Sequence, residues 1–536
     1  MKNINLDLRS QSKEINYTDF FNNYDAQEAA KHKQLNQDQL INKNSLKEEI
    51  NSHKQLLSYA HNREIIHNNL GVLYQQNNEN LKARRHFFCA LKINTTYREA
   101  LINLANSYAL EGDYAVAEKH YQHLHESGSS DPKLMINFGS ALVNQGKADK
   151  AIKVLEKAIS SDPSLGMAHY LLARSYIMKG NANRARELLN HILEKNPNLG
   201  SVQRTRADCI KFTRQTPELQ ELEEAAKRIL IDSEDFVHIN FALGKAYEDI
   251  GDIEKAFKHV KIANNALRKQ LQYDWTRDQK KFSSNSRLFN PVYFHRLENT
   301  VRGSKQSVVF LVGLPRCGSS LTHQILSMHS QVSAIGESTA LVKAILNKRI
   351  SDLQNPRVLE MIQQEYLEHH GNNQKKIVDK NLYNFFWIPL IKIIFPDAVF
   401  INLERDMSGH FWSMFKNYFT YGNEFTTSLQ DMYNYTNLYR QMIDQWRIKL
   451  GIPIHSFSYD QLVANKEESI QILLELCQLS WEDQCMNFTQ SSTAVQTASA
   501  IQVRRNIYQS SSRRGRDFNL LLKQELHQYG INMEEK

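Results

Sequence analysis

Small and large apolar residues repeat at a fixed interval along the first half of the chain. At an offset of 34 residues one small position recurs four times, at Gly71, Ala105, Gly139 and Ala173. A second small position recurs in the same register, at Ala83, Ala117, Ala151 and Ala185. Large side chains fill the position four residues after it, at Phe87, Tyr121, Leu155 and Leu189. This period predicts helical hairpins that stack into a superhelix, because one hairpin alone cannot bury its apolar face.

These columns resemble the tetratricopeptide repeat, a 34-residue helix-turn-helix unit whose small residues let its two helices approach closely. Pro163 and Pro197 close the third and fourth units, where a helix must stop. A further unit follows a less regular stretch and carries Gly244 and Ala256 in the expected columns. We therefore expect an all-α superhelix of about five repeats over residues 59–285, after a polar helical extension over residues 1–58.

The predicted array also indicates a kind of partner. The concave surface of such a superhelix usually binds a peptide or protein segment, so the resemblance implies a partner of this kind. The alternative is that the array serves only as a spacer or an oligomerisation platform, because a stable superhelix does not by itself imply a ligand. A homodimer stays open for the same reason.

The second half of the chain has a different pattern of apolar and polar residues. From about Pro291, short apolar runs alternate with amphipathic stretches, which predicts an α/β fold with a parallel sheet flanked by helices. The run VVFLVGL at residues 308–314 is continuously apolar and suits a strand that is buried on both faces. We assign residues 290–536 to this second, P-loop-like domain.

A glycine-bracketed turn follows the apolar run. Gly313 and Gly318 bracket the turn, and Ser319 and Ser320 begin a helix. Such a turn directs backbone N–H groups and the positive end of a helix toward one point, where phosphate or sulfate oxygens bind. An ATP-binding loop carries a lysine after its second glycine, and Ser319 stands there instead, which argues against a kinase or a nucleotide triphosphatase. The cation of this turn is Arg316.

Composition and charge argue against several classes of function and of site. The 536 residues carry a formal net charge of +8, which is too modest to indicate a dedicated nucleic-acid binder. The five cysteines include no CxxC pair, so neither a disulfide framework nor a thiolate zinc site is predicted. The N-terminus lacks the apolar core of a secretory signal, and no apolar run reaches the roughly 18 residues of a membrane span. We therefore expect a cytoplasmic protein.

His323, His329 and His410 lack partners at metal spacing, so we expect them to pack and expect no metal site.

The segment GLPRCGSS, residues 313–320, carries a specific resemblance. It is similar to the 5'-phosphosulfate loop of sulfotransferases, which bind 3'-phosphoadenosine 5'-phosphosulfate (PAPS) without a metal. Its arginine form resembles tyrosylprotein sulfotransferases and the bacterial proteins that join tetratricopeptide repeats to a sulfotransferase domain. The resemblance implies that the cofactor is held by Arg316, Cys317, Gly318, Ser319 and Ser320. Cys317 stands where the family usually has serine, so one hydroxyl is lost.

A second segment matches the same family. Arg405 follows the run AVFINLE, at the carboxyl edge of a predicted parallel strand where ligands bind. With Ser413 eight residues later, Arg405 resembles the element of sulfotransferases that contacts the 3'-phosphate. Farther along, the resemblance assigns Tyr459 to the adenosine site and Arg514 to the cofactor-binding cations. Asn417 departs from the pattern, because the tyrosine-modifying relatives carry another cofactor-binding arginine there.

Sulfuryl transfer needs a base for the proton of the acceptor hydroxyl and cations that neutralise the departing phosphate oxygen. The resemblance assigns the base to Glu337 and the leaving-group cation to Lys380. Arg316 then serves as cofactor ligand and transition-state cation, in the fork geometry of a guanidinium. Ser499 resembles the serine that donates to the bridging oxygen. Each residue also has an alternative role without catalysis. Glu337 could cap a helix, and Lys380 could be a solvated side chain at the end of a strand.

The predicted chain is therefore an all-α repeat superhelix followed by an α/β domain of the sulfotransferase fold. The resemblance implies a PAPS-dependent sulfotransferase without a metal, and a protein or peptide tyrosine is the expected acceptor. A small-molecule or saccharide hydroxyl stays open, because none of these residues selects among hydroxyls. The other alternative is a catalytically inactive repeat scaffold, which the departures at Cys317 and Asn417 favour.

Overall fold

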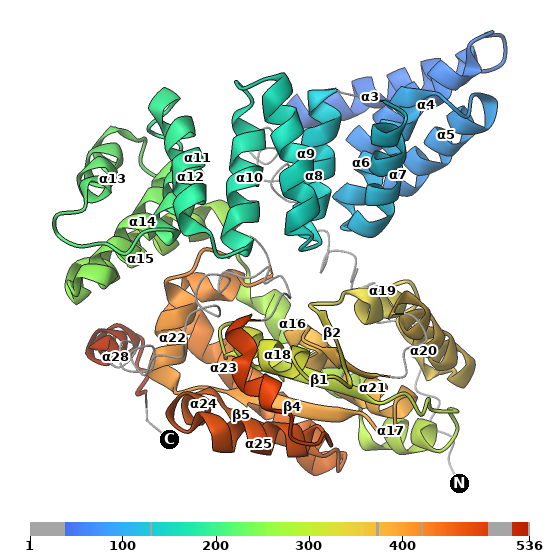
Figure 1. Ribbon diagram of the computed structural model, residues 1–536. Coiled ribbons are helices and arrows are strands. Elements are labelled where there is room, and N and C mark those ends of the chain that lie inside the picture. The colour runs from blue at the N-terminus through green and yellow to red at the C-terminus, as the bar shows by residue number, and fades with distance from the viewer. Residues whose placement is uncertain (1–37, 129–130, 371–374, 420–421, 491–516, 534–536) are drawn as a thin grey trace.

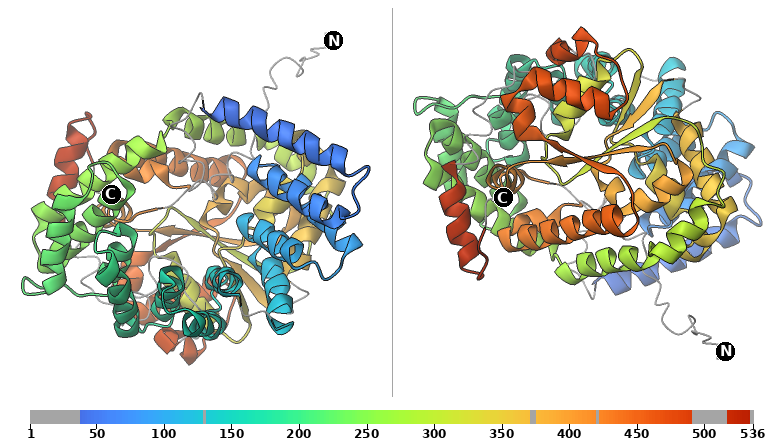
Figure 2. Two further views of the ribbon diagram at one scale, coloured as in Figure 1. Left: turned by 90° about the horizontal axis from the view of Figure 1, so that it is seen from above. Right: turned by 90° about the horizontal axis from the view of Figure 1, so that it is seen from below.

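The chain folds into an array of helices that lies across a sheet domain (Figure 1). The computed structural model describes residues 38–128, 131–370, 375–419, 422–490 and 517–533. Its described part confirms the predicted fold class, because a helical repeat region is followed by a parallel five-stranded sheet with helices. Figure 2 gives two further views, in which helices lie on both sides of the sheet.

Antiparallel helix pairs build the array. After α3 (Asp38–Leu56), the first four repeats are α4 (Arg63–Gln76) with α5 (Asn80–Ile93), α6 (Arg98–Leu110) with α7 (Tyr114–Glu126), α8 (Pro132–Asn144) with α9 (Ala148–Ser161), and α10 (Gly166–Met178) with α11 (Ala182–Lys195). The less regular stretch folds as a pair too, α12 (Gly200–Asp208) with α13 (Pro217–Arg228). The pair α14 (Glu234–Ile250) and α15 (Ile253–Leu271) follows and is called the last repeat. The repeat columns did not predict the pair α12 and α13.

Small residues let the paired helices touch. A Cβ atom added at Gly71 would lie 2.3 Å from the Phe87 ring, and one added at Gly139 would lie 2.5 Å from Leu155. Phe87 and Leu155 belong to the large-residue column of the sequence, so the predicted packing of large on small is confirmed. The alanine column is closed to solvent as well, with an exposed fraction of 0% at Ala83, Ala117, Ala151 and Ala185.

Five parallel strands form the sheet of the second half. In chain order they are β1 (Val308–Gly313), β2 (Val332–Gly336), β3 (Lys376–Asp379), β4 (Val399–Glu404) and β5 (Ile454–Ser458). Their order across the sheet is β2-β3-β1-β4-β5. The central strand β1 pairs with β3 on one side and β4 on the other, so its end lies in the middle of the carboxyl edge. Ligands of open parallel sheets bind at this edge.

The two faces of β1 belong to two separate hydrophobic cores. Val309 and Leu311 face the smaller core, whereas Val308, Phe310 and Val312 face the larger core. Within the described residues, the helices of this domain are α16 (Trp275–Leu288), α17 (Pro291–Glu298), α18 (Ser319–Ser327), α19 (Ala340–Leu346), α20 (Pro356–His370), α21 (Ile388–Ile394), α22 (Met407–Phe415), α23 (Leu429–Asp444), α24 (Tyr459–Ala464), α25 (Lys466–Leu476) and α28 (Asn519–His527). Shorter helical turns are η2 (Ile350–Gln354), η3 (Leu382–Trp387), η4 (Glu424–Thr427), η5 (Gln445–Lys449) and η6 (Asp483–Gln490).

The larger core does not stop at the sheet domain. It continues into the array, where it includes Leu243 and Phe257 of the last repeat. The Phe257 ring lies 6.1 Å from Trp412 and 5.9 Å from Phe415, both on α22. The last repeat and part of the pair α12 and α13 therefore pack with the sheet domain, whereas the earlier repeats have two cores of their own.

We expect Gly200→Ala to destabilise the array. The added Cβ atom would lie 2.5 Å from the backbone oxygen of Asp235, and this backbone cannot move aside as the end of a side chain can. The strain predicts a loss of about 2 kcal/mol in the free energy of unfolding, read as a lower midpoint of thermal denaturation. Gly166 holds the equivalent position 34 residues earlier, with no atom within 4 Å of an added Cβ. Gly166→Ala is therefore the matched control, and an equal loss in both variants would contradict the prediction.

Candidate functional site

The carboxyl edge of the sheet gathers residues from the end of every strand. Because the strands are parallel, the residues that follow them emerge on the same side. The predicted site residues that follow β1 to β5 in this way are Arg316, Glu337, Lys380, Arg405 and Tyr459. Residues that lie far apart in the sequence thus meet at one edge.

The turn after β1 has the geometry of an anion-binding loop. Gly318 has a φ of +103° and Arg316 a φ of +68°, so the chain reverses around Cys317 and leads into the first turn of α18. A left-handed backbone is unusual for a residue with a side chain, and the surrounding structure must hold it. His410 on α22 contributes, because its Nε2 donates to the carbonyl of Pro315 at 2.7 Å. Burial, and then the nearby Arg405, lowers the pKa of His410 to about 3, so its imidazole is neutral.

Arg405 lies against the same turn. Its Nη1 donates to the carbonyl of Arg316 at 3.1 Å, and its guanidinium lies 4.6 Å from the centre of the Tyr459 ring. The Tyr459 ring closes over the turn, since a Cβ atom added at Gly318 would lie 2.4 Å from it. The buried Nε of Arg405 has no hydrogen-bond partner in the described part of the chain. A buried donor of this kind needs an acceptor, and an anion at the loop would supply one.

Arg316 links the turn to α22. Its Nε donates to Ser413 Oγ at 3.2 Å. Burial, and then the charge of Arg405, lowers the pKa of Arg316 to about 10, so the guanidinium is still protonated at neutral pH. Arg316, Arg405 and Ser413 therefore form one cluster of donors with a strong positive potential. These are the residues that the sequence assigned to phosphate and phosphosulfate.

A carboxylate and an ammonium group form the other half of the edge. Lys380 Nζ lies 2.9 Å from Glu337 Oε1, and the side chains are 7% and 53% exposed, respectively. The N–H of Lys380 also donates to the carbonyl of Gly336 at 2.9 Å, which ties the ends of β2 and β3 together. The ammonium group therefore points inward and the carboxylate lies at the surface, where a substrate can reach it.

Buried side chains support the strand ends that precede Glu337 and Lys380. The Asp379 carboxylate accepts from the N–H of Asn381 at 2.8 Å and from Tyr366 OH at 3.1 Å, and burial raises its pKa to about 7. His323 Nε2 accepts from the N–H of Gly336 at 3.1 Å. Burial, and then the charge of Lys380, lowers the pKa of His323 to about 3. His323 is therefore a neutral support for the strand end that precedes Glu337.

Two predicted site residues, Ser499 and Arg514, lie outside the described residues. Cys317 is present in the turn but only 1% exposed, with its sulfur 2.9 Å from a Cβ atom built on Gly313. Burial raises the pKa of Cys317 to about 11, so it is a packing thiol. Ser319 and Ser320 begin α18 as predicted. The amide of Asn417 donates to the carbonyl of Ser413 at 2.6 Å and so is engaged within its own helix end.

Sequence reasoning missed some residues that support the edge. His410 was expected to pack, yet it also holds the loop through Pro315. Its position five residues after Arg405 was the available signal. Glu248 and Lys416 were not singled out, although they pair beside α22 at 2.6 Å. No motif could have revealed that pair, because its partners are 168 residues apart in the sequence.

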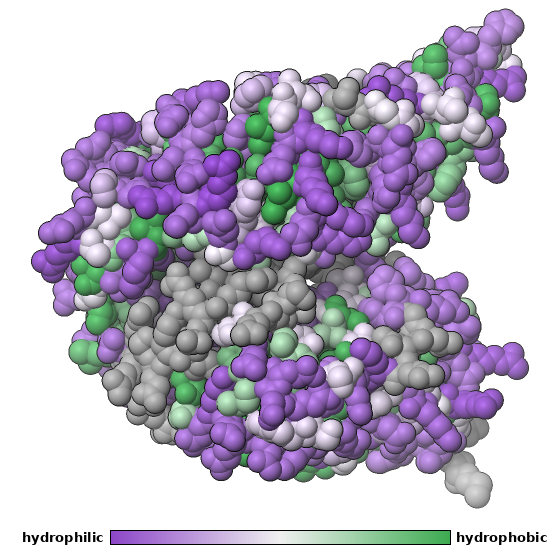
Figure 3. Space-filling view, in the orientation of Figure 1, coloured by the Kyte–Doolittle hydropathy of each residue, from purple (hydrophilic) through white to green (hydrophobic). Residues whose placement is uncertain are grey.

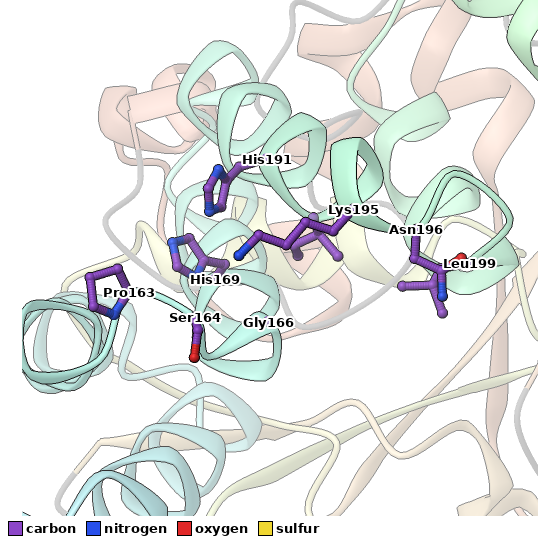
Figure 4. Close-up of a pocket in the computed structure, with 9 residues that line it drawn as sticks. Pro163, Ser164, Gly166, His169, His191, Lys195, Asn196 and Leu199 are labelled. Carbon is purple, nitrogen blue, oxygen red and sulfur yellow. The ribbon is translucent and has the colours of Figure 1, made fainter.

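The repeat array contains a pocket of its own (Figure 4). It is lined by Pro163, Ser164, Gly166, His169, His191, Ile192, Lys195, Asn196 and Leu199. The rings of His169 and His191 are 4.9 Å apart, and His169 Nδ1 donates to the carbonyl of Leu165 at 3.0 Å. The pocket contains no residue of the sheet domain and so is separate from the candidate site.

Within the described residues, no cluster of three or more histidine, cysteine or carboxylate side chains is arranged to bind a metal. None of the helices in that part of the chain combines the length and apolar character that a membrane crossing requires.

Comparison with known proteins matches both halves. Residues 308–483 match the Sulfotransferase family, and residues 142–209 match the Tetratricopeptide repeat family. Residues 99–164 match the YpiA-like C-terminal tetratricopeptide repeats. The chain joins tetratricopeptide repeats to a sulfotransferase-family domain. The resemblance that the sequence motifs carried is thereby confirmed at this level.

Related chains cover different parts of the protein. An uncharacterised protein of Aquifex aeolicus is 28% identical over 74% of this chain and 54% of its own length. A putative protein-tyrosine sulfotransferase of Caenorhabditis briggsae is 24% identical over 34% of this chain and 69% of its own length, and protein-tyrosine sulfotransferase A of Caenorhabditis elegans is 22% identical over 34% and 52%. The chain thus spans about half the length of two of these relatives. A solved tetratricopeptide repeat protein of Parabacteroides merdae is 16% identical and superimposes with a TM-score of 0.35, covering 48% of this chain and 93% of its own.

The buried thiol of the sulfotransferase-family loop yields a prediction. At pH 8 a thiol with a pKa of about 11 is ionised in roughly one molecule in a thousand, so Cys317 should react very slowly with iodoacetamide. Cys89 is partly exposed and should be alkylated at least about tenfold faster. Mass spectrometry of both peptides over time measures the two rates. Equal rates would show that the loop opens readily and that the thiol is not held as described.

Proposed function

We propose that the protein is a PAPS-dependent sulfotransferase that moves a sulfuryl group to an acceptor hydroxyl, and that this hydroxyl belongs to a protein or peptide tyrosine. The observation that carries the proposal is the cluster of Arg316, Arg405 and Ser413 beside the Glu337–Lys380 pair at one sheet edge. One group offers donors to an anion, and the other offers a base and a cation. The match of residues 308–483 to the Sulfotransferase family supports the reaction class.

The donors of the edge fit a nucleotide with anionic groups on both sides of its ribose. The loop from Arg316 to Ser320 would hold the 5'-phosphosulfate with its N–H groups and its guanidinium. The buried Arg405 Nε needs an acceptor, and Arg405 with Ser413 would hold the 3'-phosphate. Tyr459, which covers the turn, would contact the adenosine. When bound, PAPS supplies the activated sulfuryl group.

The Glu337–Lys380 pair has the chemistry that the transfer step needs. Glu337 accepts the proton of the acceptor hydroxyl, and its half-exposed position leaves it reachable. With the cofactor bound, Lys380 and Arg316 would neutralise the negative charge that grows on the leaving phosphate oxygen. The Lys380 ammonium group lies 2.9 Å from the Glu337 carboxylate, so the proposed base and the proposed cation are neighbours. Ser499 and Arg514 keep their predicted roles in this proposal.

The acceptor is proposed from three observations. Two relatives bear the name protein-tyrosine sulfotransferase and match a third of the chain. The repeat array offers a surface on which a peptide segment could be held near the edge. Figure 3 shows a hollow between the array and the sheet domain on the side of α19 and α20. A cytoplasmic location is part of the same proposal.

Nucleotide binding tests the cofactor site first. Titration calorimetry with adenosine 3',5'-bisphosphate should give binding, whereas ATP with magnesium should bind much more weakly. Arg405→Ala removes the guanidinium that faces the 3'-phosphate, so we expect affinity to fall at least tenfold, about 1.4 kcal/mol. Arg357→Ala, an exposed arginine on α20, is the matched control and should bind as the wild type does. Absence of bisphosphate binding by the wild type would refute the enzyme and leave the scaffold alternative.

Transfer tests the base. With labelled PAPS, a tyrosine peptide should gain the label, and its phenylalanine counterpart should not. Glu337→Gln keeps the shape of the side chain but cannot take the proton, so we expect turnover to fall by about a hundredfold or more. The bisphosphate affinity of this variant should stay near that of the wild type, because Glu337 lies outside the donor cluster. Labelling of a serine peptide or a saccharide in place of tyrosine would replace the proposed acceptor.

A further inference from the structure

Helix α22 carries Ser413, and the last repeat holds this helix from outside the sheet domain. Glu248 on α14 accepts a hydrogen bond from Trp412 Nε1 at 3.1 Å. The same carboxylate accepts from Lys416 Nζ, at 2.6 Å through one oxygen and 2.9 Å through the other. Trp412 and Lys416 are one helical turn apart, so a single carboxylate fixes one side of α22.

The end of α22 is also fixed by the last repeat. Asn264 on α15 donates its side-chain amide to the carbonyl of Phe415 at 2.7 Å. This carbonyl belongs to the final turn, where backbone acceptors have no partner within the helix. Beyond the helix, the Tyr418 ring lies 4.5 Å from His238 on α14. The segment from Trp412 to Tyr418 is therefore bound to the array at three points.

These contacts are enclosed, so water cannot replace them easily. The side chain of Glu248 is 8% exposed and that of Lys416 is 25% exposed. Asn264 is 1% exposed and Trp412 is 1% exposed. A partly buried ion pair of this kind resists disruption, because removing one partner leaves the other charge without compensation.

The other side of α22 faces the donor cluster. Ser413, next to Trp412 in the helix, accepts from Arg316 Nε at 3.2 Å. His410, one turn earlier, donates to the carbonyl of Pro315 in the loop. A shift or rotation of α22 would therefore move both the Ser413 hydroxyl and the support of the loop. The position of the donors depends on a carboxylate that belongs to the repeat array.

We propose that Glu248 is a positioning residue for the cofactor, which makes the last repeat an integral part of the 3'-phosphate site. The inference rests on the proposed function, because it is the proposed function that assigns the 3'-phosphate to Arg405 and Ser413. Glu248 acts through α22 and does not touch the nucleotide. The array then does more than recruit an acceptor, since it sets the selectivity of the site for a 3'-phosphorylated nucleotide.

The test compares two nucleotides on the full-length protein. Calorimetry measures the affinities for adenosine 3',5'-bisphosphate and for adenosine 5'-monophosphate, and their ratio reports the contribution of the 3'-phosphate. Glu248→Gln keeps one acceptor for Trp412 but leaves the Lys416 ammonium uncompensated, so α22 should shift and the ratio should fall about tenfold. A loss of folded protein would lower the binding stoichiometry and leave the ratio unchanged, which separates positioning from general damage.

Two further variants complete the test. Asp113→Asn breaks another ion pair between the array and the sheet domain, with Lys343 on α19, and should leave the ratio as in the wild type. Glu248→Gln combined with Lys416→Met removes both charges and should recover most of the ratio. The inference is overturned if Glu248→Gln keeps the wild-type ratio, or if Asp113→Asn lowers it equally. If wild-type protein does not prefer the bisphosphate, the proposed function fails, and this inference fails with it.

Discussion

Two arginines meet at the carboxyl edge of the sheet, where the Arg405 guanidinium is held against the backbone of Arg316, and the rest of the site is built around their like charges. Arg405 Nη1 donates to the carbonyl of Arg316 at 3.1 Å, which fixes the Arg405 guanidinium against the turn. Arg316 keeps a left-handed backbone, and its pKa is lowered by burial and by Arg405. An arrangement that is costly when empty and relieved by an anion is preorganised for that anion. The supporting contacts from His410, Ser413 and Tyr459 maintain this arrangement.

The same constraint explains why the array and the sheet domain are packed together. Helix α22 borders the donor cluster on one side, so the other side needs a rigid backing. The last repeat provides it through the core that contains Phe257 and through the carboxylate of Glu248. Nearer the beginning of the array, Lys343 on α19 pairs with Asp113 of the second repeat. These two sets of contacts fix the array relative to the sheet edge, and a segment bound on the array beside this edge would have a high effective concentration there.

Local patterns predicted the parts of the protein that depend on local physics. The strand, turn and helix after residue 308 follow from one apolar run and two glycines, and the early repeats follow from their small and large columns. The pair α12 and α13 was missed because the spacing drifts there, from 34 residues to the 37 that separate Ala207 from Gly244. Within the site, the resemblance supplied Arg405 and Lys380, whose positions after β4 and β3 follow from the parallel sheet.

Long-range contacts could not be predicted in this way. The partners Glu248 and Lys416 lie in different domains of the sequence, and neither belongs to a motif. Their pairing depends on how the last repeat docks, which is decided by the shape of a shared core and not by residue spacing. The hydrogen bond of His410 could not be predicted either. A histidine without metal-ligand partners in the sequence is expected to be a packing residue, and only the structure shows that it donates to the carbonyl of Pro315.

The placement of Glu337 depends on a backbone feature. Strands β2 and β3 pair in register up to Ala334, and an irregularity before Gly336 shifts the end of β2 against Asp379. Gly336 has a φ of +68°, which a side chain would oppose, and its carbonyl accepts from the N–H of Lys380. Glu337 therefore leaves the strand over the end of β3, beside the ammonium group of Lys380. A bulge at a strand end re-aims the following side chain, so backbone geometry sets the distance between the Glu337 carboxylate and the Lys380 ammonium group.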